Sequence, residues 1–160
     1  MKNNVLVYSR SSFKHLISVL TPDEISRSAF ISIHEPLRRT QVFEDCSSVI
    51  LESAPNVLNL WFDDAEEDFE LLDGLKCVLF DEHMAKQIHE FVDRYKEGKQ
   101  FFFHCTAGIS RSGAVGETVA EYLGIDYFEF KLENPKVKPN TLVKTLLRNQ
   151  FYGNNKERSH

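Results

Sequence analysis

The segment from His104 to Gly113 contains the residues best suited to chemistry. Its sequence, HCTAGISRSG, follows three consecutive phenylalanines and precedes a stretch with helical periodicity. In a strand–loop–helix with a small, glycine-containing loop, successive backbone N–H groups converge on one point, and the helix dipole adds partial positive charge there. We therefore expect this loop to form a cradle for an anion.

Two side chains would give the cradle its reactivity. Thiolate is the nucleophilic form of cysteine, and Cys105 lies where the loop amides and Arg111 would favour its anion. The planar guanidinium of Arg111 offers a fork for two phosphate oxygens, which a lysine cannot match. Ser112 is placed to donate to the thiolate when it becomes a leaving group. We expect His104 to support the loop geometry rather than to act as a base.

The pattern His-Cys-x5-Arg-Ser resembles the signature of the cysteine-dependent protein tyrosine phosphatases, and the AGISRS interior is most similar to compact dual-specificity-like members. The resemblance covers most of residues 50–150, whereas residues 1–50 match it less certainly. It implies that Cys105 attacks phosphorus in line and that water then hydrolyses a phosphocysteine. It also implies a phosphate site and no need for a cofactor or metal. The residues implied to bind phosphate are Thr106, Ala107, Gly108, Ile109, Ser110 and Arg111.

In this family an aspartate on a separate loop protonates the leaving oxygen. The candidates here follow the third expected strand, in LWFDD. Counting from the strand as in similar enzymes favours Asp64 as the acid and Asp63 as a neighbour that supports the loop, and both assignments stay open. The sequence distance from Asp64 to Cys105 is longer than the distance from the acid to the cysteine in compact members. We therefore predict that residues 65–79 are an insertion beside the active site.

Six of the eight residues from Asp63 to Glu70 are acidic. Such a stretch is either a solvated loop or a lid that repels polyanionic ligands.

The interior of the signature loop has no basic residue, so we expect phosphotyrosine peptides to be better substrates than polyphosphoinositides. Ile109 and Phe62 are candidates for an apolar rim around an aryl group. Arg38 and Arg39 could meet a second anionic group or could simply be solvated.

The elements that must position these residues follow from hydrophobic periodicity. Apolar runs predict strands at Val5–Tyr8, Ala29–Ile33, Val57–Phe62 and Phe101–Phe103. Helical spacing predicts helices over Phe13–Leu20, from a cap at Asp81 to about Gly98, from Ala114 to about Gly124, and from near Pro139 onwards. This alternation indicates an α/β fold with a central, largely parallel sheet flanked by helices. The functional loop should lie at the carboxyl end of a central strand.

The composition favours a single domain over residues 1–160. A hydrophobic fraction of 42% excludes intrinsic disorder, and a net charge of −5 argues against a nucleic-acid binder. The three cysteines are too scattered for a disulfide framework or a zinc site. No apolar stretch has the length of a signal peptide or of a membrane span. We therefore expect a cytoplasmic protein that binds neither membrane nor metal.

Three functions are compatible with these residues. We favour a phosphatase that acts on phosphotyrosine in proteins or peptides, with phosphoserine and phosphothreonine as further candidates. A second function is a binding module that keeps the cradle without turnover. A third is another thiol enzyme with the same loop, such as an arsenate reductase or a sulfurtransferase. In the arsenate reductase lineage the loop lies near the N-terminus, which argues against it for a loop at residue 105.

Overall fold

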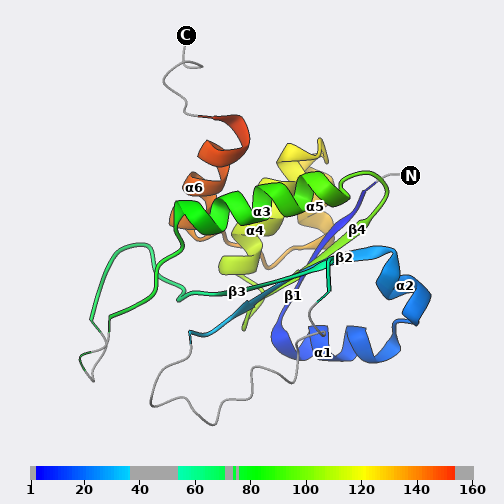
Figure 1. Cartoon of the computed structure of the whole chain (residues 1–160), viewed down its shortest axis with the longest axis horizontal. Helices are drawn as coiled ribbons and strands as arrows, with labels where there is room; N and C mark the ends of the chain where they lie inside the picture. The colour runs from blue at the N-terminus through cyan, green and yellow to red at the C-terminus, as the bar shows by residue number, and fades with distance from the viewer. Residues whose placement is uncertain (1–2, 37–53, 71–73, 75, 154–160) are drawn as a thin grey trace.

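The computed structural model describes residues 3–36, 54–70, 74 and 76–153. Within them, four strands form one parallel sheet in the order β1-β4-β2-β3 (Figure 1). The strands are β1 (Val5–Tyr8), β2 (Ser28–His34), β3 (Val57–Trp61) and β4 (Gln100–His104). All four predicted strands and their parallel arrangement are therefore confirmed. β4 is a central strand, paired with β1 on one side and with β2 on the other.

Helices cover both faces of the sheet (Figure 1). On one face lie α1 (Arg10–Val19) and α2 (Pro22–Ser26). On the other face lie α3 (Glu82–Tyr95), α4 (Arg111–Tyr122), α5 (Tyr127–Glu133) and α6 (Thr141–Tyr152). The predicted α/β architecture is confirmed.

Alternation along β4 divides the apolar side chains between two cores. Phe101 and Phe103 are fully buried in the larger core with α3, α4 and α6, whereas Phe102 packs into a smaller cluster around Phe13 of α1 and Phe30 of β2. A strand that packs helices on both faces needs apolar residues at consecutive positions. The three consecutive phenylalanines before the signature loop are thus explained.

Two short helices were not predicted. The helix predicted over Phe13–Leu20 is α1, which ends at Val19, and Thr21 then starts α2 through a capping box. Thr21 Oγ1 accepts from Glu24 N at 3.1 Å, and Glu24 Oε1 accepts from Thr21 N at 3.0 Å. The other helix is α5, which begins where the Asp126 carboxylate accepts from the N–H groups of the first turn.

The predicted helix boundaries are mostly confirmed. Asp81 caps α3 by accepting from Met84 N at 2.9 Å. The C-cap of α3 is Lys96, however, and not Gly98. α4 begins at Arg111, earlier than its apolar pattern indicated. No helix in the described part of the chain is long and apolar enough to cross a membrane.

The sheet brings the functional segments to one edge. Because all four strands are parallel, their carboxyl ends meet there, and the signature loop leaves β4 at that edge to enter α4. The predicted insertion also starts at this edge, just after β3. Its described residues turn back through an isolated bridge between Glu70 and Lys76 and return beside β3, where Asp63 N donates to Val78 O at 2.7 Å.

Candidate active site

The Cys105 thiol lies at the bottom of the loop that joins β4 to α4, and its residue is 2% exposed. Its sulfur accepts a hydrogen bond from Gly108 N at 3.3 Å and lies 3.0 Å from Ser112 Oγ. Ser112 is fully buried and so has little freedom to turn away. The predicted contacts of the thiol with a loop amide and with Ser112 are present in this geometry.

Gly108 allows the loop to pack against the start of α1. Its φ is +72°, a conformation that L side chains rarely adopt, and a Cβ there would lie 2.5 Å from Ser9 N and 2.6 Å from Tyr8 C. On the same side, Arg10 N donates to Thr106 O at 3.0 Å. The β1–α1 junction therefore supports the loop from behind.

Arg111, the first residue of α4, is 5% exposed, and three oxygens bind its guanidinium. Nη1 donates to Phe62 O at 2.9 Å, and Nη2 donates to Glu35 Oε1 at 2.6 Å and to Thr106 Oγ1 at 3.2 Å. Nε is buried and has no hydrogen-bond partner among the described residues. A buried donor without a partner carries a free-energy cost that an anionic ligand would remove. The protein thus orients the guanidinium and leaves its Nε–H without a partner among the described residues.

Sequence reasoning missed Glu35, which is important in this arrangement. It directly follows β2, and its Oε1 also accepts from Thr106 Oγ1 at 2.8 Å. One carboxylate oxygen thereby joins the start of the signature loop to the arginine at its end. The sequence did contain a signal that could have identified Glu35. It is a charged residue directly after a strand that pairs with β4, and the carboxyl ends of neighbouring parallel strands lie at the functional edge of the sheet.

The two candidate acids have different surroundings. Asp64 is exposed, and its Oδ1 accepts from Ser110 Oγ at 2.8 Å and from Asn140 Nδ2 at 2.9 Å. The carboxylate of Asp63 is largely buried, and its Oδ2 accepts from Val78 N at 2.7 Å. Asp64 therefore contacts the signature loop, whereas Asp63 anchors the two ends of the insertion to each other.

His104 is fully buried behind the loop. Its ring stacks on Phe13 at 4.2 Å, and its Nδ1 lies 3.4 Å from Cys105 O. Burial is the main cause that lowers the pKa of His104 to about 3, and the charges of His34, Arg10 and Arg111 lower it further. The imidazole is neutral at physiological pH, as the expected supporting role requires.

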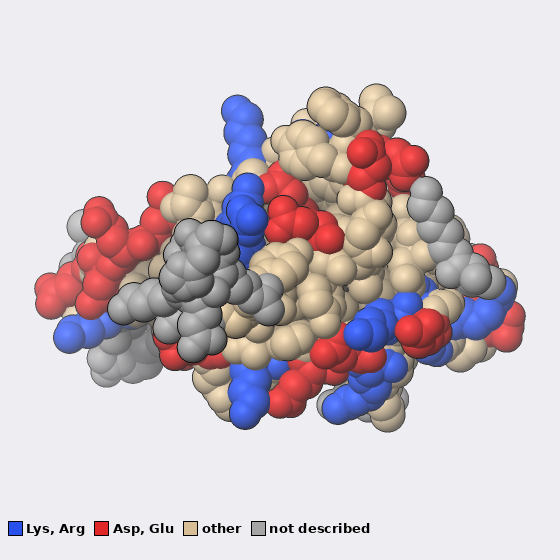
Figure 2. Space-filling view, turned by 90° about the horizontal axis from the view of Figure 1, so that it is seen from above, with Lys and Arg blue, Asp and Glu red and all other residues tan. Residues whose placement is uncertain are grey.

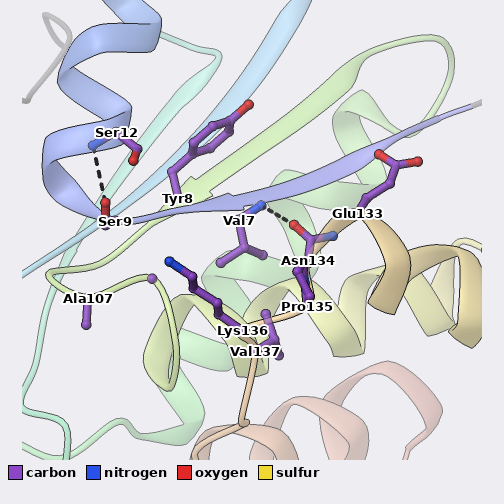
Figure 3. Close-up of a pocket in the computed structure, with 11 residues that line it drawn as sticks. Val7, Tyr8, Ser9, Ser12, Ala107, Glu133, Asn134, Pro135, Lys136 and Val137 are labelled. Atoms are coloured by element: carbon purple, nitrogen blue, oxygen red, sulfur yellow. Dashed lines mark hydrogen bonds between the residues drawn. The ribbon is translucent and has the colours of Figure 1, made fainter.

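The segment between α5 and α6 forms another wall of the site. Lys138 N donates to Ile109 O, and Asn140 N donates to Ser110 O, both at 3.0 Å. A cavity of about 200 Å³ lies between this segment and the β1–α1 junction. Figure 3 shows Lys136 extending from this segment toward the loop that carries Ala107. Lysines thus lie near the loop, although none lies within it.

Other predicted residues have mixed outcomes. Ile109 is half-buried, but Phe62 is fully buried and packs on Phe80 at 5.1 Å, so the prediction that Phe62 forms a rim is wrong. Arg38, Arg39 and Cys46 lie outside the described residues. Cys77 and Cys105 are free cysteines. Among the described residues, no group of histidine, cysteine and carboxylate side chains could hold a metal ion.

Comparison with known proteins extends these findings. No protein-family model and no curated protein matches the sequence. The solved structure of DUSP15 is similar, with a TM-score of 0.57 at 18% identity over 94% of this chain and 85% of that one. The PTP-2 phosphatase of Cydia pomonella has a TM-score of 0.52 at 16% identity over 92% of this chain and 84% of that one. A human tyrosine phosphatase-like serine/threonine/tyrosine-interacting protein has a TM-score of 0.52 at 18% identity, over 90% and 88% of the two chains. The chain therefore has the fold of the cysteine-dependent tyrosine and dual-specificity phosphatases, as its signature loop led us to expect.

Proposed function

We propose that this protein is a phosphatase that hydrolyses phosphate monoesters through a phosphocysteine. One observation supports this most strongly. The Arg111 guanidinium, fixed by Phe62 O and Glu35, follows a loop that holds a buried thiol, and its buried Nε–H has no partner in the described part of the chain. Buried polar groups in native proteins normally have partners, so an orphaned donor needs an explanation. A bound phosphate oxygen is the partner that this donor lacks.

In the first step, the sulfur of Cys105 attacks phosphorus and the bond to the leaving oxygen breaks. The N–H groups of the loop and the Nε–H of Arg111 stabilise the charge on the equatorial oxygens. Asp64 gives its proton to the leaving oxygen, which departs as an alcohol or a phenol. The phosphoryl group is then covalently bound to sulfur.

In the second step, water attacks the phosphocysteine. Asp64, ionised by the first step, takes a proton from that water. The S–P bond breaks, and Ser112 Oγ, 3.0 Å from the sulfur, donates a hydrogen bond to the departing thiolate. Inorganic phosphate leaves, and the thiolate is restored.

We infer that phosphotyrosine in a protein or peptide is the main substrate, with phosphoserine and phosphothreonine as further candidates. The surroundings of the loop differ in charge from one side to the other. Acidic residues of the insertion line an open cavity with Ser110. The cavity that Ala107 and Gly108 line holds one basic and one acidic side chain, Lys136 and Glu133. In Figure 2, acidic side chains gather at the left end of the molecule, where Figure 1 has the segment between β3 and α3.

The expected discrimination against polyphosphoinositides rests on two features, the absence of a basic residue inside the loop and the acidic segment from Asp63 to Glu70. Lys136 shares a cavity with Ala107 and Gly108, but Glu133 lines the same cavity. The proposed preference for peptides therefore rests mainly on the acidic residues that line a cavity with Ser110. It is tested by kcat/KM for a phosphotyrosine peptide and for a soluble phosphatidylinositol trisphosphate, and a preference for the lipid would refute it.

The decisive experiment is hydrolysis of an aryl phosphate by the wild-type protein and by Cys105→Ser. We expect turnover by the wild type, none by the variant, and a phosphorylated Cys105 in mass spectra of acid-quenched wild-type reactions. Turnover by Cys105→Ser would refute the mechanism. If the wild type binds phosphopeptides without turnover, the protein is a binding module instead. One similar structure is named a tyrosine phosphatase-like serine/threonine/tyrosine-interacting protein, so phosphopeptide binding by the wild type should be measured beside turnover.

A further inference from the structure

The two oxygens of the Asp64 carboxyl group are bonded unequally. Oδ1 accepts two hydrogen bonds, from Ser110 Oγ at 2.8 Å and from Asn140 Nδ2 at 2.9 Å. Oδ2 accepts none from the described residues, and the side chain is exposed beside an open cavity that Ser110 also lines. The asymmetry matters because a carboxylic acid carries its proton on one oxygen only.

The orientation of the Asn140 amide follows from its other contacts. Its Oδ1 accepts from Val143 N at 3.1 Å and so caps α6, which leaves Nδ2 to face the acid loop. Nδ2 also donates to Ala65 O at 3.2 Å, and the residue is 2% exposed. Exchanging the amide oxygen and nitrogen would lose all of these bonds. Asn140 therefore presents a donor to Asp64.

Ser110 also presents a donor to Asp64. It occupies the N-cap position of α4, where a serine side chain normally accepts a hydrogen bond from the first turn of the helix. Here the hydroxyl makes no capping bond and donates to Asp64 instead. The usual local contact is absent, and a contact with a residue 46 positions away replaces it.

We propose that Ser110 and Asn140 are positioning residues that confine the transferable proton of Asp64 to Oδ2. With both groups donating to Oδ1, a hydrogen on that oxygen would lie against theirs, and the amide nitrogen of Asn140 can only donate, so the proton is favoured on Oδ2. The two bonds also prevent rotation that would exchange the oxygens. Oδ2 gives its proton to the leaving oxygen in the first step and takes one from water in the second. This inference rests on the proposed phosphatase function and on Asp64 as its acid.

The leaving group distinguishes a positioning role from a structural one. A poor leaving group such as phenol depends strongly on protonation, whereas 4-nitrophenol departs with little help. We expect Ser110→Ala and Asn140→Ser each to lower kcat/KM for phenyl phosphate by about tenfold, a part of the 10²–10⁴-fold contribution of a general acid. For 4-nitrophenyl phosphate the loss should stay below about threefold. A serine at position 140 can still cap α6.

Two matched variants control for indirect effects. Ser110→Thr keeps the hydroxyl and should retain the wild-type dependence on the leaving group. Glu66→Ala loosens the same loop without touching Asp64, because it removes the Oε1 that accepts from Thr141 N at 3.0 Å. It should not steepen the dependence of kcat/KM on the leaving group. If Glu66→Ala behaves like Asn140→Ser, loop mobility explains the effect and the proposal is wrong.

A double-mutant cycle completes the test. If Ser110 acts through Asp64, Ser110→Ala should have no further effect on phenyl phosphate hydrolysis in an Asp64→Asn background. Additive losses, or equal losses for both substrates in the single variants, would overturn the proposal. Absence of hydrolysis by the wild type would instead refute the proposed function, so the two failures are distinguishable.

Discussion

Replacing His104 should change how the stability of the fold depends on pH. The ring is fully buried, stacked on Phe13 and 5.7 Å from His34. Burial, together with the nearby charges of His34, Arg10 and Arg111, lowers its pKa from 6.5 to about 3. In the unfolded chain the imidazole regains an ordinary pKa, so the two states bind different numbers of protons at mildly acidic pH.

The sign and size of the effect follow from this difference. Between pH 6.5 and about 3 the unfolded state binds a proton that the folded state excludes. The free energy of unfolding therefore falls as the pH falls through that window, by up to about 1.4 kcal/mol per pH unit. The stabilisation is fully present above pH 6.5, and over the whole window at most about 5 kcal/mol is lost. Burial also lowers the pKa of His34, which adds to the effect in the same direction.

Urea unfolding of the wild type and of His104→Gln across this range measures the effect. Surface carboxylates titrate in both proteins and cancel in the difference. We expect the wild type to lose about 2 kcal/mol relative to His104→Gln between about pH 6.5 and pH 4.5. His83→Gln, on the exposed side of α3, controls for the loss of a histidine as such. A difference between wild type and His104→Gln that stays constant over the range would refute the reasoning.

Three further predictions concern the site. Arg111→Lys should lower kcat/KM for an aryl phosphate by about 10²-fold or more, because the fork is lost although the charge remains; activity within a few-fold of wild type would place Arg111 outside the site. Asp64→Asn should lower kcat by about 10²–10³-fold with a smaller effect on KM, whereas Asp63→Asn should mainly lower the melting temperature, because its Oδ2 holds Val78 N at 2.7 Å. The opposite pattern in those two variants would exchange their roles. Gly108→Ala should abolish activity and lower the melting temperature. An alanine with φ of +72° costs about 1–2 kcal/mol, and its Cβ would overlap the main chain of the β1–α1 junction. A variant with full activity would contradict the described packing.

Much of the fold was predictable because its signals are local. Apolar runs of strand length and helical periodicity identified the four strands and the four longer helices, α1, α3, α4 and α6. The two short helices were missed because caps at Thr21 and Asp126, rather than periodicity, start them. Phe62 was assigned to a rim because it precedes the aspartates, but the start of the next crossover turns it against Phe80 in the core.

The sequence alone determined the relation of Cys105 to Arg111 and Ser112. These residues lie within one loop and the first turn of one helix, so backbone geometry fixes their separations once the strand and helix form. Only the tertiary structure decided which distant groups complete the site. Glu35 is 76 positions from Arg111, and Asn140 is 76 positions from Asp64. Their contacts depend on which strands pair in parallel and on where α6 packs, because those long-range choices bring the carboxyl ends of β2, β3 and β4 to a single edge.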